Sequence, residues 1–341
     1  NFMAATVAPL PPVTFLLGDE RHGRPPAGNL VEGWTTSPDG VRVHTSKWLV
    51  AQPRALVVFV HGFGHWLGDQ MYVRLAAEFN ARGIACCGVD HVAHGRSEGT
   101  RMYIPRFRDL SETSTAFARE VAAELPDGTP IFLHGESMGG AIALTMLKDA
   151  PADMFRGAVL LAPMCGIAPG TEPPAAVVAV LKLFNRCCPA APMVPVDDPL
   201  PRCFADPAAE PHARAPEHVY RGRMRLGTGL SLKNAMEELQ ADMTFLRHSC
   251  AIFQGTGDRV TDPVMARRLF DRCTSQDATF FEYEGAQHAL YWEQLSTRRQ
   301  MLEDVTEWIL ERSDPKAAPS AGKHVLSRPL GTGGFMAPEV G

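Results

Sequence analysis

The sequence has no Cys-x-x-Cys pair, no cluster of lysines and arginines, and no uninterrupted apolar run long enough to cross a bilayer. Its eight cysteines do not combine with its histidines into a zinc-finger pattern. Several of these cysteines lie in apolar runs, where a thiol behaves as a small buried side chain. We therefore expect no metal, no cofactor and a reducing, cytoplasmic setting. A net charge of −5 without a basic cluster also argues against nucleic acid as a partner.

Short apolar runs alternate with amphipathic stretches from Gly33 onward. The nearly continuous apolar runs are typical of parallel strands buried on both faces, and the alternating run 41–50 is typical of an antiparallel strand. The apolar runs are 55–60, 83–89, 130–134, 157–162 and 251–254, and the helix-like stretches are 69–82, 110–125, 138–148, 262–273 and 295–312. This order predicts an α/β fold with a mostly parallel, doubly wound sheet.

One long stretch interrupts this alternation. Between Pro163 and Ser249 we find no convincing core strand, prolines are dense up to Pro216, and the clearest helix is 230–246. An insertion at the carboxyl ends of sheet strands would lie over the ligand crevice, so we predict a helical cap. The expected organisation is a poorly ordered tail at 1–30, core at 31–163, cap at 164–248, core at 249–312 and a second poorly ordered tail at 313–341.

The strongest local signal is a serine between two glycines, in Gly135-Glu136-Ser137-Met138-Gly139, directly after the apolar run 131–133. A serine on a tight strand-to-helix turn takes a strained backbone conformation, and the flanking glycines let the strand and the helix approach each other. A serine that only caps an ordinary helix is the alternative. The strand before the motif and the apolar helix after it favour a catalytic nucleophile at Ser137.

Acyl transfer also needs hydrogen-bond donors for the oxyanion. One donor is the amide after the nucleophile, that of Met138, and the second comes from the loop after an earlier strand. Here that loop is His61-Gly62-Phe63-Gly64, in which Gly62 and Gly64 allow the Phe63 amide to turn toward the nucleophile. A glycine-rich turn without a donor role is the alternative. We expect His61 to brace the loop.

The base and its acid should follow the serine along the chain. Asp258 follows the run 251–254, and His288 follows the next strand-like run, 279–283. Two consecutive parallel strands would thus bring an acid and an imidazole to the edge that carries Ser137. We predict His288 as the general base and Asp258 as its orienting acid. Asp262 competes with Asp258, but it would lie in the first turn of a helix, where a carboxylate usually interacts with the helix dipole.

A histidine-rich segment, Asp90-His91-Val92-Ala93-His94, follows another predicted strand. One aspartate beside an H-x-x-H pair is weak evidence for metal binding without a second cluster. We expect a hydrogen-bonded structural loop.

The motifs together resemble the monoacylglycerol lipase and lysophospholipase-like branch of the α/β hydrolases, and plant-type members are the most similar. They are HGFG (61–64), DHVAHGRSEG (90–99), GESMGG (135–140), GTGDRVTDP (255–263) and GAQHAL (285–290). The resemblance covers about residues 33–312. It implies the α/β-hydrolase fold, oxyanion donors at Phe63 and Met138, and a cap that roofs an acyl-chain tunnel.

The sequence departs from this family just after the HGFG turn. Animal lipases of the group carry an acidic residue, a histidine and, shortly afterwards, an arginine, whereas here the run is His65-Trp66-Leu67-Gly68-Asp69. The residues that would meet a glycerol head group therefore do not carry over.

The function expected from these features is hydrolysis of a lipid carboxylic ester through an acyl-enzyme on Ser137, with a monoacylglycerol as the leading substrate. A lysophospholipase, a small aromatic-ester carboxylesterase or an acyltransferase would use the same triad. A ligand-binding receptor on a hydrolase scaffold is the alternative from another class, and the complete triad favours an enzyme.

Two further segments stand out. The cap run 175–184, AAVVAVLKLF, has Lys182 as its one polar residue. One interpretation is that this run packs into the cap and the sheet. The other is that its outer face, with Val178 and Leu181, forms the mouth of an acyl tunnel and inserts into membranes or micelles. The segment 331–339 resembles the end of a kinase activation segment. The chain lacks the other kinase motifs, so we expect no phosphoryl transfer.

Overall fold

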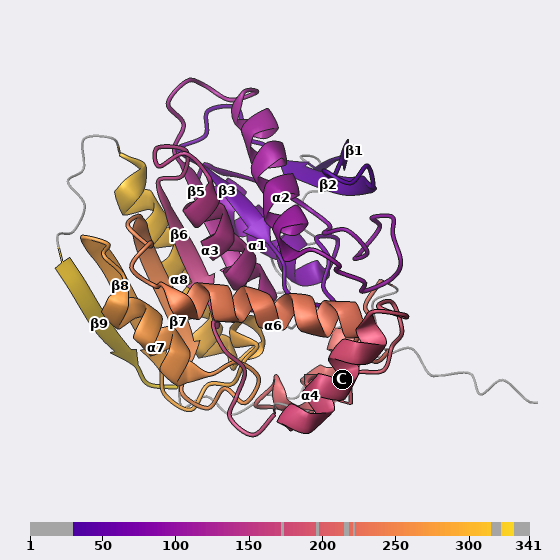
Figure 1. Cartoon of the computed structure of the whole chain (residues 1–341). Coiled ribbons are helices and arrows are strands. Elements are labelled where there is room, and N and C mark those ends of the chain that lie inside the picture. Colours follow the sequence, from indigo (N-terminus) through magenta and orange to yellow (C-terminus); the bar gives the residue numbers. More distant parts are fainter. Residues whose placement is uncertain are drawn as a thin grey trace, which may run out of the picture.

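A computed structural model describes residues 30–171, 174–195, 198–214, 218–220, 222–314 and 322–330 (Figure 1). The strands are β1 (Leu30–Thr36), β2 (Arg42–Trp48), β3 (Ala55–Val60), β4 (Ile84–Val89), β5 (Ile131–Glu136), β6 (Gly157–Leu161), β7 (Ser249–Gly255), β8 (Asp277–Tyr283) and β9 (Gly322–Arg328). The α-helices are α1 (Gln70–Ala81), α2 (Phe107–Ala122), α3 (Met138–Asp149), α4 (Ala175–Asn185), α5 (Ala209–Arg214), α6 (Leu226–Ala241), α7 (Pro263–Arg272) and α8 (Leu295–Ser313). Two short 3₁₀ helices are η2 (Leu200–Arg202) and η3 (Leu290–Trp292).

The strands form one sheet in the order β1-β2-β4-β3-β5-β6-β7-β8-β9. Strand β2 pairs antiparallel with β1 and β4, and all pairs from β4 to β9 are parallel. The predicted mostly parallel α/β sheet is therefore confirmed, as is the antiparallel strand near 41–50.

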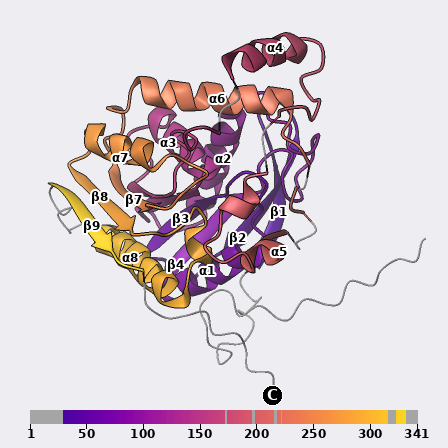
Figure 2. The ribbon, with the colours of Figure 1, turned by 90° about the horizontal axis from the view of Figure 1, so that it is seen from below.

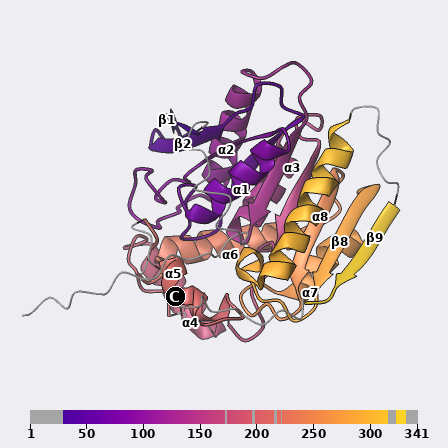
Figure 3. The same cartoon turned by 180° about the vertical axis from the view of Figure 1, so that it is seen from behind.

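Helices cover both faces of this sheet, which explains the continuous apolar runs. All six residues of β3 are buried. Leu56, Val58 and Val60 belong to the core on the face of α2, α3 and α7, while Val57 and Phe59 belong to the core on the face of α1 and α8. Figures 1 and 3 show these two helical layers from opposite sides. Burial on both faces leaves no polar face for the strand to alternate with.

The chain between β6 and β7 supplies α4, η2, α5 and α6. We call this part the cap. Helix α6 packs against α2 and α3, and α4 packs against α6. In Figure 2, α6 lies across one side of the core, with α4 outside it. Within the described residues, no helix is both long and apolar enough to cross a membrane.

Strand β9 lies within 313–341, where a poorly ordered tail was expected, so that expectation is wrong for this part. The strand pairs with β8 along its length, from Asp277↔Gly322 to Tyr283↔Arg328. Arg328 also donates to Asp304 of α8 at 2.7 and 2.9 Å. The strand sequence GKHVLSR has only a weak alternation of apolar and polar residues, and it carries three basic or imidazole side chains. Its apolar pattern therefore does not predict a strand. Residues 1–29 and the kinase-like segment 331–339 lie outside the described residues.

Candidate active site

Ser137 occupies the turn between β5 and α3 with backbone angles φ 56° and ψ −119°. This is a strained region for a residue other than glycine. The neighbouring glycines are required because the backbones are in contact there. A Cβ on Gly139 would lie 1.9 Å from the Val60 carbonyl oxygen, and one on Gly135 would lie 2.5 Å from the Gly139 carbonyl oxygen. The turn therefore holds the Ser137 hydroxyl at the carboxyl edge of the sheet.

Three sheet loops bring the predicted triad residues together. His288 Nε2 lies 3.0 Å from Ser137 Oγ, and His288 Nδ1 lies 2.8 Å from Asp258 Oδ2. Asp258 follows β7 and His288 follows β8, so neighbouring parallel strands place both side chains beside the β5–α3 turn. Asp258 and His288 are both buried. This chain of hydrogen bonds can move a proton from a serine hydroxyl to an imidazole.

Asp258 is held by four hydrogen bonds besides the one to His288. Its Oδ1 accepts from the backbone amides of Val260 and Thr261 at 2.8 and 3.0 Å. Its Oδ2 accepts from Thr261 Oγ1 at 2.6 Å and from Gln254 Nε2 at 3.1 Å. Thr261 and Gln254 were not expected at the site. The Asp-x-x-Thr spacing, which lets an aspartate close a turn on its own backbone, was the signal for Thr261.

Asp262, the competing carboxylate, caps α7. Its Oδ1 accepts from the Val264 amide at 2.9 Å. The helix-start position that we expected for Asp262 is therefore what the structure has.

The acid and the imidazole adjust each other's protonation. Burial disfavours the charged form of His288, but the Asp258 carboxylate outweighs burial, and the pKa of His288 lies above its ordinary 6.5. Burial likewise opposes ionisation of Asp258, but His288 and the Thr261 hydroxyl outweigh it and lower its pKa. The pair thus favours an imidazolium beside a carboxylate once a proton is taken up.

The loop after β3 lies against the turn that carries Ser137. A Cβ on Gly62 would lie 3.3 Å from the Glu136 carbonyl oxygen and 3.4 Å from Ser137 Cβ, and Gly64 has a positive φ of 79°. Phe63 lies between these glycines and lines the same cavity as Ser137. Met138 begins α3, so its amide is among those at the helix start that no helix carbonyl can satisfy.

His61 fixes the orientation of this loop. Its Nδ1 lies 2.9 Å from the Gly62 carbonyl oxygen, and its Nε2 accepts from the His91 amide at 2.9 Å. Burial first, then the neighbouring His91 and His94, hold the pKa of His61 well below 6.5. A neutral ring must therefore donate through Nδ1. The Gly62 carbonyl and the Phe63 N–H belong to one peptide plane, so this bond also orients the Phe63 amide.

Asp90 organises the histidine-rich segment as a structural loop. Its Oδ1 accepts from the Leu67 amide at 2.8 Å, and its Oδ2 accepts from the Arg96 amide at 2.9 Å. In the part of the chain that the structure describes, no group of three or more His, Cys, Asp or Glu side chains could hold a metal ion.

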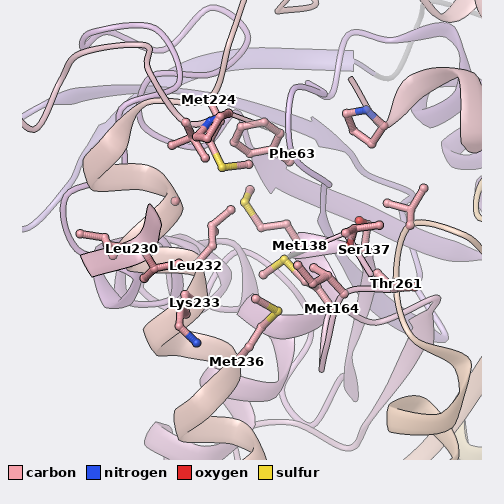
Figure 4. Close-up of a pocket in the computed structure, with 18 of the residues that line it drawn as sticks. Phe63, Ser137, Met138, Met164, Met224, Leu230, Leu232, Lys233, Met236 and Thr261 are labelled. Atoms are coloured by element: carbon pink, nitrogen blue, oxygen red, sulfur yellow. The ribbon is translucent and has the colours of Figure 1, made fainter. Parts of the chain in front are cut away.

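A cavity of about 450 Å³ opens between Ser137 and the cap. Figure 4 shows Met138 and Met164 near Ser137, with Leu230 and Lys233 at the end away from it. Methionines supply much of the apolar wall and adapt readily to flexible ligands. The other cap residues of this wall include Val178, Leu181, Val194, Met224, Leu226, Leu232 and Met236.

The cavity corrects the expected orientation of α4. Val178 and Leu181 line the cavity and are half-buried, whereas we expected them on the outer face. The outer face instead exposes Val180, Leu183 and Phe184, at 53%, 62% and 48%. A helix that is apolar nearly all round gives no periodic signal for its inward side.

Sequence comparisons with known proteins identify one family and several relatives. Residues 51–294 match the protein family described as Hydrolase_4, serine aminopeptidase, S33. The chain is 30% identical to the monoglyceride lipase of Mus musculus, over 76% of this chain and 84% of that protein. It is 30% identical to the monoacylglycerol lipase of Mycolicibacterium smegmatis, over 80% of this chain and 94% of that protein. It is 27% identical to the caffeoylshikimate esterase of Arabidopsis thaliana, over 76% and 78%.

A solved structure of a monoglyceride lipase from Saccharomyces cerevisiae, in complex with a substrate analog, has a similar fold. The TM-score is 0.72 at 18% identity, over 85% of this chain and 97% of that one. At this identity the likeness concerns the fold alone.

Proposed function

This chain belongs to the serine aminopeptidase S33 family of α/β hydrolases, and we propose that it cleaves monoacylglycerols through an acyl-enzyme on Ser137. The observation that carries the proposal is the hydrogen-bonded chain of Ser137, His288 and Asp258 at one end of an apolar cavity. The cavity wall suits a fatty acyl chain, because burying each methylene contributes about 0.8 kcal/mol. Curated relatives named as monoglyceride lipases support the same substrate class.

The proposed reaction begins when Ser137 Oγ attacks the ester carbonyl carbon and its proton passes to His288 Nε2. The carbonyl oxygen becomes an oxyanion that accepts from the Phe63 and Met138 amides. The tetrahedral intermediate then breaks its bond to the alcohol oxygen, which takes the proton from His288. Water, deprotonated by His288, attacks the acyl-enzyme. The bond between the acyl carbon and Ser137 Oγ then breaks, Ser137 takes the proton back from His288, and the fatty acid is released. Asp258 keeps the His288 ring in the orientation that both steps need.

The same residues would also serve other acyl substrates. The relative named caffeoylshikimate esterase supports an ester of an aromatic acid as the second candidate. A lysophospholipase differs only in the head group of its substrate, and an acyltransferase differs only in using an alcohol in place of water in the last step. Product analysis with each ester, with and without added alcohol, separates these activities. A receptor would bind an ester without turnover.

We also propose that the protein is cytoplasmic and that the cap contacts membranes or micelles. All eight cysteines are free thiols and six of them are buried, which fits a reducing compartment. The exposed apolar face of α4 is the surface that would meet lipid.

The decisive experiment measures covalent labelling by a fluorophosphonate together with hydrolysis of a 1-monoacylglycerol. We expect one labelled serine in the wild type, and loss of labelling in Ser137→Ala. Turnover should fall by about 10⁴-fold or more, because only binding and the oxyanion donors remain. Ser231→Ala removes a hydroxyl from α6, outside the catalytic turn, and should keep both properties. Labelling that persists in Ser137→Ala would refute the assignment of the nucleophile.

A further inference from the structure

Two cationic side chains, those of Lys233 and Arg202, line the catalytic cavity, and only Lys233 has an acidic partner among the described residues. Lys233 lies at the end away from Ser137 (Figure 4), and it donates to Glu237 at 2.7 Å. The guanidinium of Arg202 forms no hydrogen bond or ion pair with any residue of the described ranges. Asp198, four residues earlier, is occupied by Arg214 and by the Leu200 amide. Arg202 is half-buried, so its charge is partly removed from water without a partner among the described residues.

Arg202 lies on the side of the cavity that adjoins His288. It ends η2, and the next residue, Cys203, accepts at its carbonyl from the Ala289 amide at 2.9 Å. Cys203 and Ala289 also share an apolar cluster with Phe204. The turn of Arg202 is thus fastened to the loop of His288. Because the general base returns its proton to the leaving oxygen, the alcohol portion of an ester lies on this side.

The acyl portion has a different part of the cavity available to it. Met164, Leu232 and Met236 form an apolar wall that extends from Ser137 toward Leu230. The cavity wall includes no aspartate or glutamate among the residues that the structure describes, so no carboxylate contacts a ligand there. Pro199, which precedes η2, and Val260, which packs against the cluster of Cys203 and Phe204, also line the cavity and offer no side-chain hydrogen bonds.

We propose that Arg202 is a specificity-determining residue that selects esters whose alcohol portion carries an anion, a phosphate or a carboxylate. This inference rests on the proposed ester hydrolysis at Ser137, and it narrows the preferred alcohol portion from neutral glycerol to an anionic one. A guanidinium presents a planar fork of donors that matches either anion with two parallel hydrogen bonds. The anion supplies the partner that Arg202 lacks within the described ranges, and it holds the leaving oxygen beside His288.

The test compares three esters with the same short acyl chain, each kept below its critical micelle concentration. They are the neutral glycerol monoester, the glycerol 3-phosphate monoester and an ester of a hydroxycarboxylic acid. We expect the wild type to favour an anionic ester in kcat/KM. Arg202→Gln should lower kcat/KM for that ester by about 10- to 100-fold and for the neutral ester by less than about twofold. Arg202→Lys, which keeps the charge and loses the fork, should lie between the two. The anionic ester with the larger loss identifies phosphate or carboxylate as the group bound.

Arg223→Gln is the matched control, because Arg223 is an exposed cap arginine outside the cavity. It should leave the ratio between the esters unchanged, and melting temperatures should show that all variants are folded. Two results would overturn this inference and leave the proposed ester hydrolysis standing. One is a wild type with the same kcat/KM for neutral and anionic esters, and the other is an Arg202→Gln variant whose kcat/KM falls equally for both. A wild type that hydrolyses none of the three esters and is not labelled by a fluorophosphonate overturns the proposed function as well.

Discussion

His288 lies between a hydroxyl and a carboxylate, and this position sets the expected pH dependence of the reaction. In the proposed mechanism turnover needs the neutral imidazole, and Asp258 raises the pKa of His288 above 6.5. We therefore expect kcat/KM to fall as the pH is lowered through a value above 6.5. Asp258→Asn removes the charge that favours the imidazolium. The acid limb should then move to lower pH, and kcat should fall by about 10⁴-fold because the tautomer is no longer fixed. Steady-state kinetics across the pH range measure both effects.

Asp262→Asn is the control for this variant. Asp262 contacts the start of α7, so its replacement should change stability by at most about 1 kcal/mol and leave the pH profile in place. A larger loss of kcat in Asp262→Asn than in Asp258→Asn would reverse our assignment.

The positions of the triad residues could be predicted because they depend on chain topology. A serine after one parallel strand, an aspartate after a second and a histidine after a third must reach the same edge of the sheet. The contacts of Thr261 depend instead on how a single turn closes, and those of Arg202 on how the cap folds back. The Asp-x-x-Thr spacing is compatible with the Thr261 contacts but does not by itself predict them, and the position of Arg202 has no comparable signal, so the structure was needed to find both.

Helix α4 has two apolar faces with different surroundings, and this separates two functions within one element. Replacing Leu183 and Phe184 with serine removes exposed side chains, so the melting temperature should change little. If this face contacts lipid, activity on a long-chain ester in vesicles should fall by about tenfold or more, since each such side chain contributes about 1.5–3 kcal/mol when it leaves water. Activity on a soluble short-chain ester should persist.

Leu181→Ser provides the contrasting variant, because Leu181 lines the cavity. It should reduce activity in both assays. Equal losses on both substrates in the Leu183 and Phe184 variant, with a lower melting temperature, would show that the outer face is structural and does not contact lipid.

The buried central strands could be predicted from the sequence, whereas the two edge strands of the sheet, β1 and β9, could not. Strands such as β3 and β7 are buried on both faces and therefore form continuous apolar runs. Strand β9 is held at the edge of the sheet by its pairing with β8 and by the ion pair between Arg328 and Asp304. Edge strands depend on such partners more than on their own apolar pattern. For the same reason, the pattern does not predict the exposed strand β1, which lies at the edge of the sheet and pairs with β2.

Four buried histidines predict how the stability of the whole molecule depends on pH. Burial lowers the pKa of each of them, to about 3 for His91, about 4 for His94 and His134, and well below 6.5 for His61. Below pH 6.5 the unfolded chain binds protons that the folded chain excludes, so the free energy of unfolding must fall as the pH drops. Each histidine contributes up to about 1.4 kcal/mol per pH unit. The contribution of His288 to this pH dependence has the opposite sign, because its pKa is raised. The four histidines with lowered pKa values outweigh this single contribution.

Denaturant unfolding at pH 7 and pH 5 measures this loss before the carboxylates titrate in the unfolded chain, at about pH 4. We expect lower stability at pH 5, and a smaller difference in His134→Gln, which removes one titrating ring from the core. The glutamine must replace the bond between His134 Nε2 and the Tyr291 hydroxyl, 2.8 Å apart, so the comparison uses the pH difference within each protein and not its absolute stability. Equal stability at the two pH values would mean that protons reach these rings in the folded state, and the neutral His61 that orients the Phe63 amide would then be in question as well.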